Sequence, residues 1–190
     1  MARYVAFALL VVLTACRSSA DIEPAVTTSS RAPITLTVNE IHESIEASPP
    51  ASGTFKDRRR SARLGEAAKS FLQTRLLAGG GSGTLNAVVT EATVIEHSRA
   101  KTSGFMDFFV SEPDADFEAE LAVRLSITDG LGVETAFAEV KVARTRAVPE
   151  GLDVIEQDAI SEALINDLLR QLDEQLTNTA NDDLAAYKAF

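Results

Sequence analysis

The stretch FEAELAVRLSITDGLGVETAFAEVKVARTR, residues 117–146, contains two alternations of apolar and polar residues around a turn signal. The first alternation places apolar side chains on one face of a strand: Phe117, Ala119, Leu121, Val123, Leu125 and Ile127. Asp129-Gly130 is typical of a tight hairpin turn. The return strand repeats the pattern with Ala136, Ala138, Val140 and Val142. The stretch therefore predicts an antiparallel hairpin with one buried face and one solvated face.

One amphipathic helix is expected before this hairpin in the sequence, and a second one after it. In residues 60–78, Leu64, Phe71, Leu72 and the aliphatic stem of Arg75 recur at helical spacing. Asp153 resembles the start of a capping box for the second helix. Its apolar stripe covers about six turns: Ile155, Ala159, Ile160, Ala163, Leu164, Leu168, Leu172 and Leu176.

Two further strands precede the hairpin. Residues 34–39 alternate apolar and polar side chains, and residues 84–97 are rich in Val, Thr and Ile. The glycines of GGGSG, residues 79–83, are interpreted as a helix stop and a turn, because a phosphate-binding loop would open a helix and contain a lysine. The predicted fold class is α+β: a two-layer sandwich with a mainly antiparallel four-stranded sheet and two amphipathic helices, in the order β-α-β-β-β-α.

The first residues are typical of an export signal. Arg3 precedes an apolar run, residues 4–13, which is too short to span a bilayer, and small residues lead to Cys16. We therefore expect a signal peptide in residues 1–15 and a lipidated tether, rich in Ser, Thr, Pro and Ala, in residues 16–32. A single α+β domain would occupy residues 33–177, and a polar C-terminal tail residues 178–190.

The run Leu13-Thr14-Ala15-Cys16 resembles the lipobox of bacterial lipoproteins. The resemblance implies diacylglycerol on the Cys16 thiol and a further acyl chain, such as palmitate, on its amine. Two or more chains hold a protein stably on a membrane. Because Arg17 rather than an aspartate follows, the family's sorting habit implies the periplasmic face of the outer membrane.

Two longer stretches, LAGGGSGTLNAVVTEATVIE (residues 77–96) and AFAEVKVARTRAVPE (residues 136–150), resemble lipoproteins of Gram-negative bacteria. The order of elements is similar to that of lipopolysaccharide-assembly and transporter-auxiliary lipoproteins. This resemblance implies a cell-envelope protein of the predicted fold and supplies no catalytic residues.

The composition and motifs disfavour several classes of function. A formal charge of −10 opposes nucleic-acid binding, and one cysteine permits neither an intrachain disulfide nor a zinc site built from cysteines. His42 and His97 have no further ligand at metal-binding spacing, and no nucleophile elbow is present. The sequence therefore predicts a protein that is not an enzyme and has no cofactor or metal.

Two clusters are candidate contact sites. Four arginines in an acidic chain match the geometry of phosphate and suggest an anionic headgroup contact, although they could instead pair with the protein's own carboxylates: Arg58, Arg59, Arg60 and Arg63. Four apolar residues between the second and third predicted strands suggest a contact with an envelope protein, although they could instead plug the sandwich: Phe105, Met106, Phe108 and Phe109. The predicted function is a membrane-anchored adaptor or assembly factor for an envelope complex, and the alternative is a carrier that holds an apolar molecule between sheet and helices.

Overall fold

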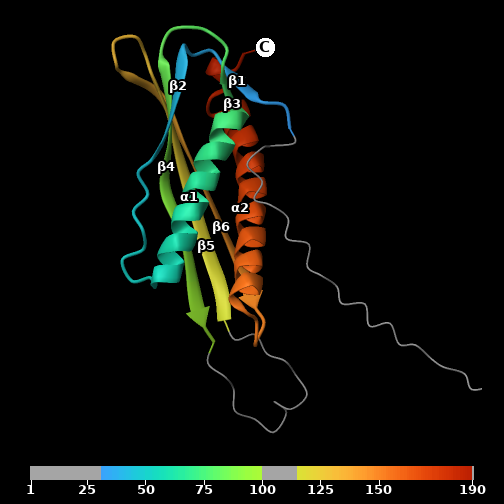
Figure 1. Cartoon of the computed structure of the whole chain (residues 1–190). Coiled ribbons are helices and arrows are strands. Elements are labelled where there is room, and N and C mark those ends of the chain that lie inside the picture. The colour runs from blue at the N-terminus through green and yellow to red at the C-terminus, as the bar shows by residue number, and fades with distance from the viewer. Residues whose placement is uncertain (1–30, 100–114, 190) are drawn as a thin grey trace, which may run out of the picture.

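The computed structural model describes residues 31–99 and 115–189, which form two layers (Figure 1). The elements are β1 (Ile34–Leu36), β2 (Glu40–Ile45), α1 (Phe55–Arg75), β3 (Leu76–Ala78), β4 (Thr84–Ser98), β5 (Ala115–Thr128), β6 (Glu134–Val148), α2 (Val154–Asp182) and the 3-10 helix η1 (Ala185–Tyr187). Two helices and a mainly antiparallel four-stranded sheet confirm the predicted α+β class.

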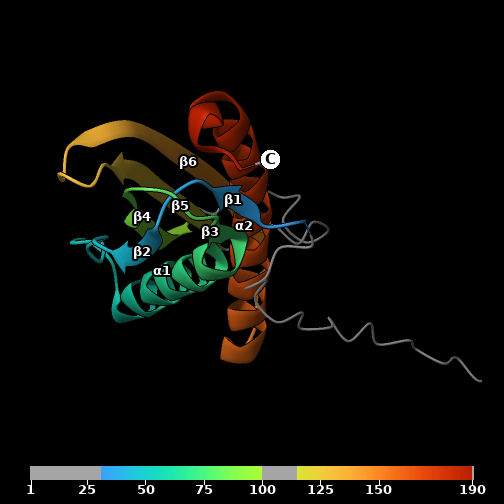
Figure 2. The ribbon, with the colours of Figure 1, turned by 90° about the horizontal axis from the view of Figure 1, so that it is seen from above.

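The main sheet has the strand order β2-β4-β5-β6, with β4, β5 and β6 antiparallel and the short β2 parallel to β4. The predicted hairpin is its centre, where Leu121 of β5 lies between Ala92 of β4 and Val142 of β6. Both helices lie on one face of this sheet, as the view from above shows (Figure 2). The other face carries the polar half of each alternation and is called here the open face.

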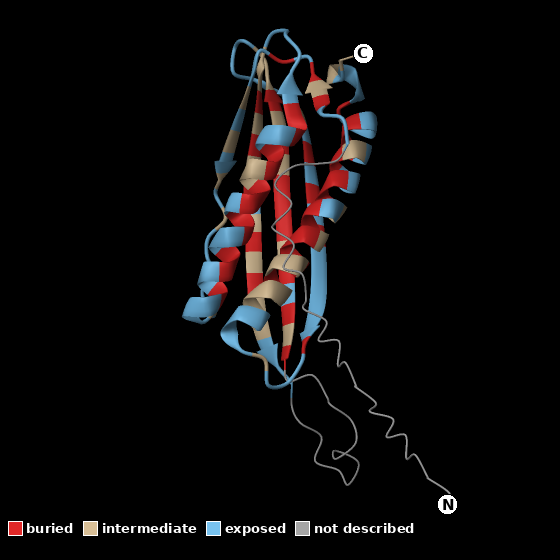
Figure 3. Ribbon diagram, turned by 45° about the vertical axis from the view of Figure 1, so that its right-hand side comes forward, coloured by how far each residue is buried: buried red, intermediate tan, exposed pale blue. Residues whose placement is uncertain are grey.

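The core lies between the sheet and the helices, where buried residues of both layers face one another (Figure 3). Among the largest side chains with almost no exposure are Phe71, Leu72, Phe117, Leu121, Leu164 and Leu168. These side chains form one contiguous cluster between the sheet and the helices.

The region around the glycines differs from the sequence prediction. The predicted first strand is shorter than expected: β1 ends at Leu36, and the next strand, β2, begins at Glu40. The predicted first helix ends at Arg75, and the following residue, Leu76, begins β3, which pairs in parallel with β1. The glycine turn therefore follows a strand rather than a helix. Its backbone passes so close to the segment between β1 and β2 that a Cβ atom on Gly81 would lie 2.5 Å from the carbonyl oxygen of Thr37. Only glycine fits there.

α1 starts earlier than predicted, and α2 ends later than predicted. α1 begins at Phe55, because Thr54 and Asp57 form a capping box, an N-terminal signal that lies before the apolar stripe. α2 continues to Asp182, and the following residues return to β1 instead of forming a separate tail. There the Thr37 amide donates to the Tyr187 carbonyl (2.6 Å), and the Ala189 amide donates to the Thr35 carbonyl (2.9 Å).

Candidate functional site

The first turns of α1 and α2 lie side by side and run in the same direction (Figure 1). Arg59 lies 2.8 Å from Asp158, and one turn later Arg63 forms an ion pair with Glu162. Between the helices is a groove of about 580 Å³, called here the arginine groove. Its lining residues are Arg59, Arg60, Ala62, Arg63, Glu66, Asp158, Ser161 and Glu162.

The charges that line the arginine groove compensate one another. The hydrogen bond to Glu162, the largest effect, raises the pKa of Arg63 above its ordinary value. Arg59 donates a hydrogen bond to Asp158 at 2.8 Å. An anionic headgroup phosphate would therefore have to compete with Asp158 and Glu162 for these two arginines. A ligand could bind in the groove only by rearranging these ion pairs.

The four predicted arginines differ in their surroundings. Arg60 is only 5% exposed: it lies 3.0 Å from Glu96, and its guanidinium carbon lies 4.2 Å from the centre of the Phe117 ring. Arg60 therefore supports the fold and is not available to a membrane surface, which corrects its place in the predicted set. Arg58, which donates to the Gly53 carbonyl at 2.7 Å, and the paired Arg59 remain exposed, as does Arg63.

The headgroup contact therefore stays a prediction for Arg58, Arg59 and Arg63. The predicted lipidation site, Cys16, lies outside the described residues. So do all four residues of the predicted protein contact: Phe105, Met106, Phe108 and Phe109.

A buried arginine lies at the opposite end of α1. Arg75 is 2% exposed and donates from Nε to Asp173 (2.5 Å), from Nη2 to Thr177 (2.9 Å) and from Nη1 to the Ala32 carbonyl. These groups are called here the Arg75 clamp. The clamp joins the C-terminal parts of both helices to Ala32, the last residue of the predicted tether. Arg31 adds exposed ion pairs to Asp173 and Glu174.

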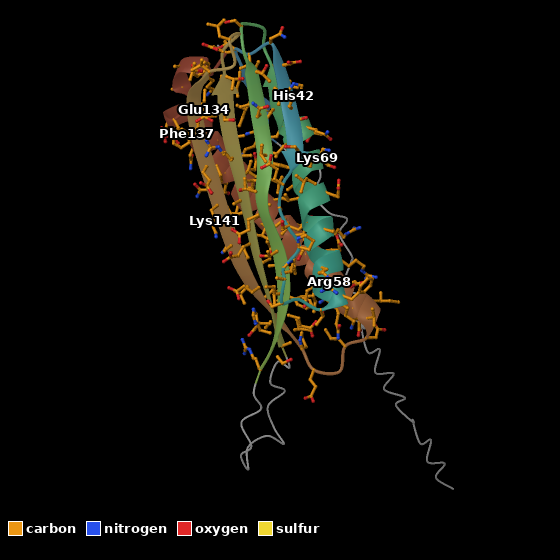
Figure 4. All side chains as sticks on the ribbon, turned by 90° about the vertical axis from the view of Figure 1, so that its left-hand side faces the viewer. His42, Arg58, Lys69, Glu134, Phe137 and Lys141 are labelled. Atoms are coloured by element: carbon orange, nitrogen blue, oxygen red, sulfur yellow. The ribbon has the colours of Figure 1, made fainter. Side chains whose placement is uncertain are left out.

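The open face of the sheet is solvated and carries cross-strand ion pairs (Figure 4). Lys141 lies 2.8 Å from Glu91, and this hydrogen bond lowers the pKa of Glu91 and raises the pKa of Lys141. His97 lies 3.0 Å from Glu118. Within residues 31–99 and 115–189, no group of three or more His, Cys, Asp or Glu side chains is placed to hold a metal ion.

Large apolar side chains are exposed at both ends of the molecule. At the end where both helices begin, called here the helix-start end, they are Phe55, Val154 and Ile155. At the other end, around the β5–β6 turn, they are Leu131, Val133 and Phe137, called here the hairpin patch. Neither set was found from the sequence. The signal in the turn was an apolar Leu131 between two glycines, which was interpreted only as part of a turn.

Comparisons with known proteins gave weak structural similarities. No family model matches the sequence, and no curated protein matches it. A minor lipoprotein from Acinetobacter baumannii is 15% identical, with a TM-score of 0.39, and the match covers 82% of this chain and 98% of that one. The rare lipoprotein B from Shewanella oneidensis is 12% identical, with a TM-score of 0.39 and coverage of 78% and 98%. These scores are too low to assign a shared fold or a function to this chain.

No helix in the described part of the chain is both long enough and apolar enough to cross a bilayer.

Proposed function

We propose that this chain is a lipid-anchored protein of the bacterial envelope, held through Cys16 at the periplasmic face of the outer membrane, where it acts as a non-enzymatic adaptor for an envelope complex. The proposal combines the lipobox-like sequence before Cys16 with the way the domain is joined to the residues that follow it.

The Arg75 clamp is the observation that carries the proposal. Arg75 ties the carbonyl of Ala32, the last residue of the predicted tether, to Asp173 in the core. β1 then continues the attachment by pairing with β3 and with the C-terminal residues. A force on the tether would thus act first on the hydrogen bond between Ala32 and Arg75, whose side chain is held by the buried bond to Asp173.

The helix-start end supports the adaptor role. Phe55 and Ile155 are 75% and 69% exposed there, beside the arginine groove with its mixture of charges. Exposed apolar side chains bordered by polar groups are typical of protein contact surfaces. β4 ends and β5 begins at this same end, since Glu96 and Phe117 both contact Arg60.

The anchor is tested by replacing Cys16. A Cys16→Ser protein should lose metabolic palmitate labelling and leave the membrane fraction, because the anchoring free energy lies in the acyl chains. Ser18→Ala is the matched control and should retain both properties. Continued labelling of the Cys16→Ser protein would sink the lipid-anchor proposal.

The adaptor role is tested at the helix-start end. Phe55→Ser with Ile155→Ser should abolish in-cell crosslinks to an envelope protein while leaving the melting temperature nearly unchanged, since both side chains are exposed. Leu77→Ser, at an exposed apolar site near the other end of α1, is the control. Crosslinks that persist in the double variant would remove this end from the adaptor proposal.

A further inference from the structure

The β5–β6 turn holds an apolar side chain out into solvent. Leu131 is 90% exposed, and the turn around it is fixed by one side chain. The Asp129 carboxylate accepts hydrogen bonds from the Leu131 amide (2.8 Å) and the Val133 amide (3.0 Å), and the Asp129 amide donates to the Val133 carbonyl (2.9 Å). The projection of Leu131 is therefore a property of the folded turn.

The other two members of the hairpin patch are exposed as well. Val133 is 57% exposed, and Phe137 is 61% exposed on the open face, near Glu134 (Figure 4). The acids nearest to the patch have partners within the protein: the Asp129 carboxylate accepts from backbone amides, and Glu134 lies 3.0 Å from Arg124. Both carboxylates therefore keep hydrogen-bond partners when the patch contacts an apolar phase.

The hairpin patch lies at the end of the domain that the tether joins. Thr37, three residues after Ile34, donates its amide to the Tyr187 carbonyl, and the Tyr187 hydroxyl lies 2.8 Å from the hydroxyl of Thr135 in β6. Gly83 lies against the base of the same turn, since a Cβ on it would be 2.4 Å from the Thr128 carbonyl oxygen. The start of the domain and the hairpin are thus joined by direct contacts.

The length of chain before the domain also favours this end. Residues 17–30 span at most about 50 Å when fully extended. The helix-start end begins at Phe55, 20 residues before Arg75 in α1, which corresponds to about 30 Å along the helix. Bringing that end to the membrane would use more than half of the tether's reach, whereas the hairpin patch lies at the end of the domain where β1 begins (Figure 1).

We propose that the hairpin patch contacts a zwitterionic lipid surface beside the Cys16 anchor, so that the helix-start end points away from the membrane. This orientation is an alternative to the headgroup contact predicted for Arg58, Arg59 and Arg63, which lie at the helix-start end. The net charge of −10 disfavours anionic headgroups and leaves zwitterionic ones as the matching chemistry. The contact rests on the proposed lipid anchor and adds the orientation of the domain to it.

The chain has one cysteine and no tryptophan, so both ends can be probed separately. The chain from Cys16 onward is coupled through that thiol to maleimide lipids in vesicles of phosphatidylethanolamine and phosphatidylcholine with brominated acyl chains, which quench nearby tryptophan. Leu131→Trp reports on the hairpin patch, and Ile155→Trp is the matched reporter at the helix-start end. Phe137→Trp serves as a second reporter on the patch.

The Leu131→Trp and Phe137→Trp proteins should lose most of their emission on the brominated vesicles, while the Ile155→Trp protein keeps most of it. Adding Val133→Ser with Phe137→Ser to the Leu131→Trp protein should reduce the quenching. Quenching of Ile155→Trp alone, equal quenching at both ends, or none at either end would overturn the proposed contact. Because the coupling is chemical, these results do not depend on whether cells acylate Cys16, which palmitate labelling decides separately.

Discussion

The two ends of helix α1 place the same chemistry in opposite surroundings. At its C-terminal end, Arg75 is 2% exposed and pairs with Asp173 of α2. In its first turns, Arg59 and Arg63 also pair with carboxylates of α2, but their side chains are 61% and 60% exposed. Removing one partner of a buried pair leaves an uncompensated charge, whereas water compensates an exposed one. The residue types alone do not distinguish the two cases.

The strongest test of this difference compares Arg75→Ala with Arg59→Ala. Arg75→Ala should lower the free energy of unfolding by about 3–5 kcal/mol, because Asp173 remains buried without its main cation. Arg59→Ala should cost about 0–1 kcal/mol. Urea unfolding at neutral pH measures both.

A double variant separates the charge from the contacts. Arg75→Met with Asp173→Leu leaves no unpaired charge and should recover part of the stability that Arg75→Ala loses. If Arg75→Ala proved no more harmful than Arg59→Ala, the Arg75 clamp would not hold the tether, and the observation that carries the proposed function would be lost.

The hairpin and the helices could be predicted because their patterns are long. Alternation over residues 117–127 and 136–142 gave β5 and β6, and capping at Asp153 gave the start of α2. β3 could not be predicted, since Leu76–Ala78 continues the apolar stripe of α1 and becomes a strand only by pairing with β1. The conformation of these three residues therefore depends on a tertiary contact and not on local periodicity.

The candidate sites were predicted less well, because exposure decides them. Four neighbouring arginines drew attention as a group, yet Arg60 is buried over Phe117. Arg75 was interpreted only as an aliphatic stem in the stripe, although its head makes the Arg75 clamp. The exposure of Leu131 could not be predicted, because this residue lies within the turn that Asp129-Gly130 indicates. A sequence shows residue types and spacing, but whether a side chain meets solvent or a partner depends on the whole fold.

A second test compares the two halves of α2. Leu168 and Ile155 belong to one predicted stripe, yet Leu168 is fully buried and Ile155 is mostly exposed. Leu168→Ala should cost about 2–5 kcal/mol through lost burial and the cavity that remains. Ile155→Ala should change the free energy of unfolding by less than about 0.5 kcal/mol. Equal losses in the two urea unfolding curves would mean that the helix-start end is covered in solution.

The smallest expected effect concerns an exposed ion pair on the open face, far from either end of α1. Lys141 contacts Glu91 at 2.8 Å and Glu120 at 3.3 Å. Its hydrogen bond lowers the pKa of the Glu91 carboxyl, and the bond to Glu91 raises the pKa of Lys141. A carboxyl with a lowered folded pKa adds stability above its unfolded pKa, and that stability is lost as the pH falls through the folded value.

Glu91→Gln should therefore be slightly less stable than the parent protein at neutral pH, and the difference should vanish on acidification below the ordinary pKa of glutamate, about 4.3. At alkaline pH, the raised pKa of Lys141 gives stability that is present below about pH 10.4 and is lost as the pH rises through the pKa of Lys141 in the folded protein. The difference in stability between Glu91→Gln and the parent should therefore shrink there too. Urea midpoints across this pH range measure both limbs, with Glu139→Gln on the same face of β6 as the control. Parallel curves for Glu91→Gln and its parent would show that solvent screens this pair completely, and that only buried pairs such as Arg75 and Asp173 contribute to stability.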